Sequence, residues 1–196
     1  KAMTPARCTQ IKSVCLGLLL LAGIILASGC VPAVSLLAID VVRDEREPRA
    51  YWQDNKAEMD IRLSIYRNKT ISDTNVSVTI WNAVVLLTGE VPDQQAIDRI
   101  LDIAKSHHYT RQVVNRIELA GRTNRASRIN DSWLTGRVKT ALVVSGTVDP
   151  TRFKVVTERA NVYLMGLVTS AEATEAVMIV RGVPGVVRVI KVFEYL

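Results

Sequence analysis

The chain has 196 residues, of which 48% are hydrophobic and 22% are charged, and its formal net charge is +6. This composition excludes a disordered chain, and the length fits two small domains behind a leader segment. With three cysteines, two of them in the first fifteen residues, a disulfide-stapled scaffold is also excluded.

The first thirty residues predict export. Three basic residues are followed by an apolar run over 14–27, which is shorter than the ~20 residues that a transmembrane helix needs. Small residues follow, so the segment 1–29 is predicted to be a signal peptide. An ordinary signal peptide cut elsewhere and an uncleaved anchor remain alternatives.

The end of this segment, Leu26-Ala27-Ser28-Gly29-Cys30, resembles a bacterial lipobox. That resemblance implies a covalent N-acyl group and an S-diacylglycerol on Cys30, and we expect no other cofactor. Several acyl chains would anchor the protein stably. Val31 follows the cysteine, and the sorting rule that accompanies a lipobox then favours the periplasmic face of the outer membrane. Residues 30–51, dense in charges of both signs, are expected to be the lipidated cysteine and a solvated tether.

Two stretches that begin at Val76 and Phe153 repeat one pattern 77 residues apart, with the same spacing to Gly89 and Gly166. The first copy is expected to start near Trp52, with Asp54 as the candidate N-cap of its opening helix. The expected elements that follow are strands over 76–80 and 84–91 joined by a turn at 81–83, a helix after Pro92-Asp93, and a strand over 113–119.

The second copy predicts the same order with clearer signals. Its expected elements are a helix from Trp133 to about Val144, strands over 153–157 and 162–168, a helix after the capping box Thr169–Glu172 and before Gly182, and a strand over 186–195. The last strands are 76 rather than 77 residues apart, so one residue has been lost before the final strand.

The fold class predicted from this order is α+β. Each copy forms an α-β-β-α-β two-layer sandwich with two helices on one face of a three-stranded mixed sheet. The predicted domains are residues 52–119 and 131–196, joined by a linker over 120–130.

The pattern Val-x-Val-x6-Val-x-Leu-x-Gly, followed by a helix and an apolar strand, resembles the BON domain (bacterial OsmY and nodulation). Its most specific segments are 130–135 and 162–169, whereas the first copy lacks the glycine that usually precedes the last strand. Two such domains behind a lipobox are similar to division- and envelope-stress-associated outer-membrane lipoproteins. The resemblance implies that the second domain binds anionic phospholipid and supports outer-membrane integrity.

The opening helix of the second copy carries the candidate lipid-binding residues. Trp133 lies in its first turn, and an indole ring prefers the interface between membrane and water. The complete candidate set is Trp133, Arg137, Val138, Val143, Val144, Arg128 and Lys139. From the residues alone, packing of Trp133 against the first domain is an equal alternative, and the family resemblance favours lipid.

The sequence gives no sign of an enzyme. His107 and His108 are adjacent and would point about 100° apart on a helix, which makes a poor metal pair. We expect no metal site, no small-molecule substrate and no catalytic residue.

Charge leaves the partner open. Residues 50–119 carry a net charge of −1 and residues 120–196 a net charge of +5, which favours an anionic partner for the second half. The alternative function is an adaptor that contacts an envelope, cell-division or cell-wall assembly through the sheet of the first domain or through Trp52 and Trp81. Nucleic acid is not expected as a partner of an exported protein.

Overall fold

The computed structural model describes residues 48–71, 74–121 and 125–196. The predicted signal peptide, Cys30 and the tether as far as residue 47 lie outside these residues. The part from Arg43 onward is one compact unit, and its three clusters of buried hydrophobic residues draw only on described residues. A unit with its own cores is expected to fold alone, so the fragment Arg43–Leu196 is a suitable object for experiments.

The predicted order of elements is confirmed in both copies. The first domain consists of α3 (Pro48–Arg67), β1 (Asn75–Trp81), β2 (Val84–Val91), α4 (Gln94–Ser106) and β3 (Gln112–Leu119). The second consists of α5 (Arg125–Ser145), a short 3-10 turn (Pro150–Arg152), β4 (Phe153–Glu158), β5 (Asn161–Val168), α6 (Ser170–Arg181) and β6 (Arg188–Tyr195). In each domain the middle strand pairs antiparallel with the strand before it and parallel with the strand after it, so both sheets are mixed.

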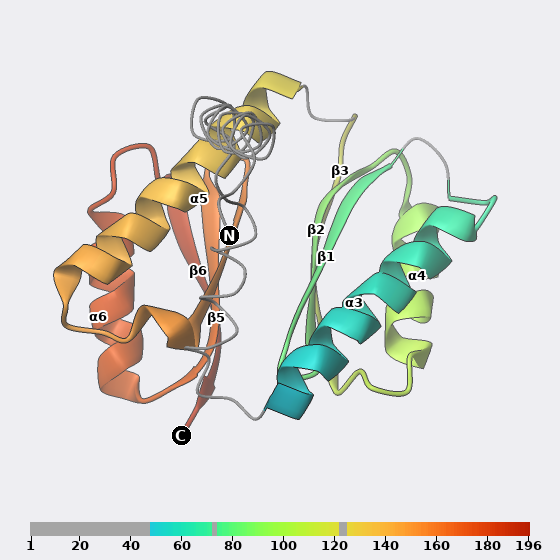
Figure 1. Cartoon of the computed structure of the whole chain (residues 1–196). Coiled ribbons are helices and arrows are strands. Elements are labelled where there is room, and N and C mark those ends of the chain that lie inside the picture. The colour runs from blue at the N-terminus through green and yellow to red at the C-terminus, as the bar shows by residue number, and fades with distance from the viewer. Residues whose placement is uncertain (1–47, 72–73, 122–124) are drawn as a thin grey trace, which may run out of the picture. The chain divides into compact units, whose positions relative to one another are not determined.

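Each domain places its two helices on one face of its sheet (Figure 1). In the second domain, alternate residues of the strands meet the apolar sides of α5 and α6 in one core, in which Leu134, Val138 and Leu142 are at most 1% exposed. The first domain builds an equivalent core around Ile61 and Ile100. Each is the two-layer sandwich that the pattern predicts.

The spacing between matching residues of the two copies changes from 77 to 76 between the middle strand and the second helix. In the first domain β2 ends at Val91 and the N-cap of α4 is Asp93, whereas in the second β5 ends at Val168 and Thr169 is directly the N-cap of α6. The residue predicted to be lost is therefore missing at this junction. The predicted capping box at Thr169 and Glu172 is present.

Both opening helices begin earlier than predicted, at Pro48 and Arg125. Asp54 is therefore not an N-cap but lies inside α3, as Asp131 lies inside α5, and both side chains are at most 5% exposed. The carboxylate of Asp131 accepts hydrogen bonds from the backbone N–H groups of Arg159 and Ala160, both at 2.9 Å. Asp54 accepts the equivalent pair from the turn of the first hairpin.

The hairpin turns explain why these carboxylates are needed. Both central residues of each turn, Asn82-Ala83 and Arg159-Ala160, have positive φ, as a two-residue type I′ turn requires. Only Asn82 among the four belongs to a residue type that tolerates this conformation well. In both domains the buried carboxylate satisfies the two N–H groups of a strained turn and ties it to the opening helix.

Glycine is required at the matched positions of the middle strands. Gly89 has φ of +114°, and a Cβ atom there would collide with the carbonyl oxygen of Asn75. At Gly166 a Cβ atom would lie 2.5 Å from the carbonyl oxygen of Arg152. The identical spacing to these glycines thus reflects a close approach of the middle strand to backbone at the start of β1 in the first domain and just before β4 in the second.

The sheet faces away from the helices share a third apolar cluster, formed by Trp81, Val84 and Leu86 of the first domain with Tyr163 and Met165 of the second. Ion pairs between the domains accompany it. Arg159 reaches Glu118 at 2.7 Å and Glu90 at 3.5 Å, and Lys154 reaches Glu58 at 3.4 Å. The two domains therefore contact each other through both apolar and charged groups.

This contact contains a carboxyl group with a raised pKa. Burial, together with the nearby charges of Glu90, Asp131 and Glu118, raises the pKa of Glu158 to about 7, against the lowering influence of Arg159. Because the pKa is raised in the folded state, the protonated form is favoured there. The contribution of Glu158 to the stability of the fold is complete below its ordinary pKa of about 4.5 and is lost as the pH rises through about 7.

We therefore expect Glu158→Gln to raise the free energy of unfolding at pH 8 and to change it little at pH 4.5. Glutamine keeps the size of the side chain but cannot acquire the charge that burial disfavours. Urea unfolding of the fragment Arg43–Leu196 at both pH values measures this. An unchanged difference between the two pH values in the variant would show that Glu158 is not the titrating group.

Candidate functional site

Helix α5 presents a band of exposed apolar side chains on the side away from the core. Trp133 is 60% exposed, and Ile129, Val143 and Val144 are exposed between 61% and 77%. Successive residues are 100° apart on a helix, which places these four within one sector. We call this set the α5 stripe.

Cations flank the α5 stripe on both sides. Arg137 lies beside Trp133, with its guanidinium carbon 4.7 Å from the centre of the indole ring, and it donates a hydrogen bond to the carbonyl oxygen of Pro184 at 3.0 Å. Lys139 and Arg128 are exposed, and at 100° per residue they lie along the opposite edge of the stripe. The result is an apolar centre with one cation, Arg137, on one side and two cations, Lys139 and Arg128, on the other.

Of the seven predicted residues, six lie on this surface and one does not. Val138 is fully buried in the core of the second domain, because its position on α5 faces the sheet, so its side chain has no access to an external ligand. Its inclusion was wrong. Trp133, Arg137, Val143, Val144, Arg128 and Lys139 lie along the exposed part of α5.

Two exposed residues of this region were missed. Ile129 was assigned to the linker, because the helix was expected to begin at Trp133, but it lies on α5. Ile129 lies 77 residues after Trp52, where the first copy is expected to start, and this spacing is a signal that the second copy also starts before Trp133. Met178 on α6 is 56% exposed and extends the apolar surface beyond α5.

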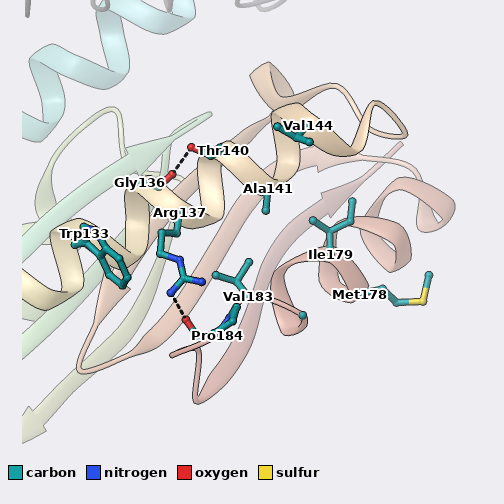
Figure 2. Close-up of a pocket in the computed structure, with 11 residues that line it drawn as sticks. Trp133, Gly136, Arg137, Thr140, Ala141, Val144, Met178, Ile179, Val183 and Pro184 are labelled. Carbon is teal, nitrogen blue, oxygen red and sulfur yellow. Dashed lines mark hydrogen bonds between the residues drawn. The ribbon is translucent and has the colours of Figure 1, made fainter.

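A groove of about 790 Å³ opens between α5 and α6 beside the stripe. It is lined on one side by Trp133, Arg137 and Val144 and on the other by Met178, Ile179 and the turn 182–184 (Figure 2). Gly136 lies at its α5 wall, where no side chain extends. The stripe and the groove share Trp133 and Val144, so they form one continuous surface.

The first domain differs at the same place. Its opening helix exposes Trp52, Met59 and Tyr66 at intervals of seven residues, and Leu63 is partly exposed beside them. Trp81, by contrast, is only 6% exposed, because it packs in the cluster between the domains. The expectation that Trp81 contacts an external partner is therefore wrong, whereas Trp52 remains available.

Two further observations on the described residues concern membrane spans and metal sites. Within 48–71, 74–121 and 125–196, no helix combines the length and the apolar character that crossing a bilayer demands. In the same residues, no group of three or more His, Cys, Asp or Glu side chains gathers as metal ligands would. His107 instead lies 3.7 Å from the carboxylate of Asp60.

Comparison with known proteins identifies the family. The model of the BON domain matches residues 53–121 and 130–196. The outer membrane lipoprotein DolP of Haemophilus influenzae is 33% identical over 182 residues, which are 91% of this chain and 94% of that protein. The 21 kDa hemolysin of Actinobacillus pleuropneumoniae is 28% identical over 153 residues, covering 78% of this chain and 79% of its own length.

Among solved structures, CdsD, a structural protein of the type III secretion system of Chlamydia trachomatis, is 12% identical with a TM-score of 0.29. The match covers 70% of this chain and 91% of that chain. The two family matches and the similarity to DolP suffice: the chain belongs to the BON domain family, as an outer-membrane lipoprotein that carries two copies of the domain.

Proposed function

We propose that this protein binds anionic phospholipid through the α5 stripe of its second domain and thereby supports the integrity of the outer membrane. The observation that carries the proposal is the arrangement of α5, in which exposed Trp133, Val143 and Val144 lie between Arg137 on one side and Lys139 and Arg128 on the other. Apolar side chains that enter the headgroup region, with cations at their edges, are typical of a helix that lies in a membrane interface. The role is one of binding, without catalysis.

The expected strength of this interaction is modest. Each basic residue near an anionic surface contributes ~1 kcal/mol, and a partly inserted tryptophan adds a similar or larger amount. A sum of ~4–6 kcal/mol corresponds to a dissociation constant between about 1 mM and tens of micromolar. This suits a protein held at the membrane by acyl chains on Cys30, because tethering supplies roughly millimolar effective concentration.

Lipid composition and salt test the proposal directly. The fragment Arg43–Leu196 should co-sediment with phosphatidylglycerol vesicles several-fold more strongly than with phosphatidylcholine vesicles. The preference should fall as NaCl rises from 50 to 500 mM, because salt screens the attraction between the cations and the phosphates. Equal binding to both kinds of vesicle at low salt would contradict an electrostatic contribution from Arg128, Arg137 and Lys139.

An adaptor that contacts an envelope protein is the second candidate, and exposed Trp52, Met59 and Tyr66 on α3 favour it. These side chains form a narrow band, and Lys56 and Asp60 beside it carry charges of opposite sign. Mixed charge suits a protein partner better than an anionic bilayer. Trp52→Glu would weaken such a contact without affecting the binding of vesicles.

A further inference from the structure

Gly136 has no role that the fold explains. It lies in the interior of α5, where a glycine makes the helix less stable than an alanine would by about 1 kcal/mol. Its φ is not positive, and a Cβ atom built at this position meets nothing within 4 Å. Neither backbone conformation nor close packing therefore requires glycine here, in contrast to Gly89 and Gly166.

What glycine does provide is open space. Gly136 is one of the residues that line the groove between α5 and α6 (Figure 2), and a Cβ atom at this position would lie in open space at the rim of that groove. The remaining walls are mainly apolar, with Ala141, Val144, Ile179 and Val183 among them. The guanidinium of Arg137, held against Trp133 and the Pro184 carbonyl, supplies positive charge at the groove.

The first domain is an internal comparison. The residue 77 positions before Gly136 is Met59, which is 60% exposed on α3. The residue that corresponds to Arg137 is Asp60, which lies 3.7 Å from His107. The same fold thus places a long side chain where the second domain has none, and an anion where the second domain has a cation.

We propose that the groove between α5 and α6 holds one acyl chain of an anionic phospholipid, with the phosphate directed toward Arg137. This inference rests on the proposed function and specifies how the lipid is bound. Three observations support it: a mainly apolar groove of about 790 Å³ that is open along its length, a cation at that groove, and continuity with the α5 stripe. The lipid would come from the bilayer that the stripe contacts.

Replacing Gly136 by methionine, the residue at the matching position of the first domain, gives a test. Insertion of α5 alone and an acyl chain in the groove predict opposite changes in binding to vesicles. If α5 only inserts into the bilayer, an added apolar side chain beside Trp133 strengthens binding, because it buries more apolar surface. If the groove holds an acyl chain, the added side chain occupies that space and weakens binding. We expect Gly136→Met in the fragment Arg43–Leu196 to bind phosphatidylglycerol vesicles at least fivefold more weakly.

Two controls separate this effect from other causes. Ser132→Met adds the same side chain at an exposed position of α5 that is not part of the groove lining, and it should bind at least as strongly as the unmodified fragment. Gly136→Ala should raise the melting temperature, since alanine favours the helix, and should keep binding within about twofold. Circular dichroism confirms that all variants remain folded.

The outcomes distinguish the inference from the proposed function. Stronger or unchanged binding by Gly136→Met, together with loss of binding by Trp133→Glu, would overturn the acyl-chain site and leave the α5 stripe as the lipid contact. Unchanged binding by both variants would overturn both. Weaker binding by Gly136→Met with unchanged or stronger binding by Ser132→Met supports the groove.

Discussion

Replacing Asp131 by alanine is expected to lower the free energy of unfolding of the second domain by about 3 kcal/mol. The carboxylate is 5% exposed and accepts two backbone hydrogen bonds, both at 2.9 Å, from the turn Arg159-Ala160. Removing it leaves two N–H groups without their acceptor in a turn whose residues both have positive φ. Hydrogen bonds to a charged group contribute about 1.5–3 kcal/mol each, and partial access of water to the turn reduces the sum.

Urea unfolding of the fragment Arg43–Leu196, followed by circular dichroism, measures this loss. Asp131→Asn should lie between the parent and Asp131→Ala, because its NH2 group replaces one of the two accepting oxygens and cannot accept a hydrogen bond. Ser132→Ala, at the exposed neighbouring position, should change stability by less than about 0.5 kcal/mol. If Asp131→Ala were as stable as Ser132→Ala, the account of the turn would be incorrect.

Replacing Trp133 by glutamate is expected to weaken binding to phosphatidylglycerol vesicles by more than tenfold. The change removes the largest exposed apolar side chain of the α5 stripe, and it places an anion opposite anionic headgroups. The lost burial and the added repulsion are each worth at least ~1 kcal/mol, and 1.4 kcal/mol already corresponds to a factor of ten. The indole is 60% exposed, so stability should change little.

Trp52→Glu is the matched control for this variant. Trp52 is 65% exposed on α3, the helix of the first domain that corresponds to α5. The same replacement there changes the net charge by the same amount and removes a similarly exposed indole, and it should leave binding within about twofold. Equal losses from the two replacements would indicate that general charge, rather than the α5 stripe, governs attachment to the vesicles.

The architecture could be predicted because it follows from local patterns. Alternating apolar residues mark β1, nearly continuous apolar runs mark the middle strands β2 and β5, and the capping box marks the start of α6. The repeat itself shows that one unit is used twice. The beginnings of α3 and α5 could not be predicted in this way. Asp54 has the appearance of an N-cap in the sequence, and Asp131 precedes the helix expected from Trp133. Only the folded chain brings a hairpin turn against each carboxylate.

The sequence predicts where the candidate site lies, but not which of its residues are buried or that a groove adjoins it. Trp133 and Arg137 could be assigned to one side of a helix from spacing alone. Val138 can be excluded only when it is known which side of α5 faces the sheet. Trp81 can be excluded as a contact for an external partner only when the cluster between the domains is known. The groove depends on α6, whose position against α5 is a tertiary property that no local pattern contains.

Titration of the fragment Arg43–Leu196 with phosphatidylglycerol micelles, followed through the three tryptophan indole N–H resonances, tests the central claim most directly. Trp133, Trp52 and Trp81 are the three tryptophans of the chain, and they lie on the α5 stripe, on α3 and in the cluster between the domains. The account predicts that the Trp133 resonance shifts or broadens while the other two stay in place. A shift of the Trp52 resonance with an unmoved Trp133 resonance would contradict it.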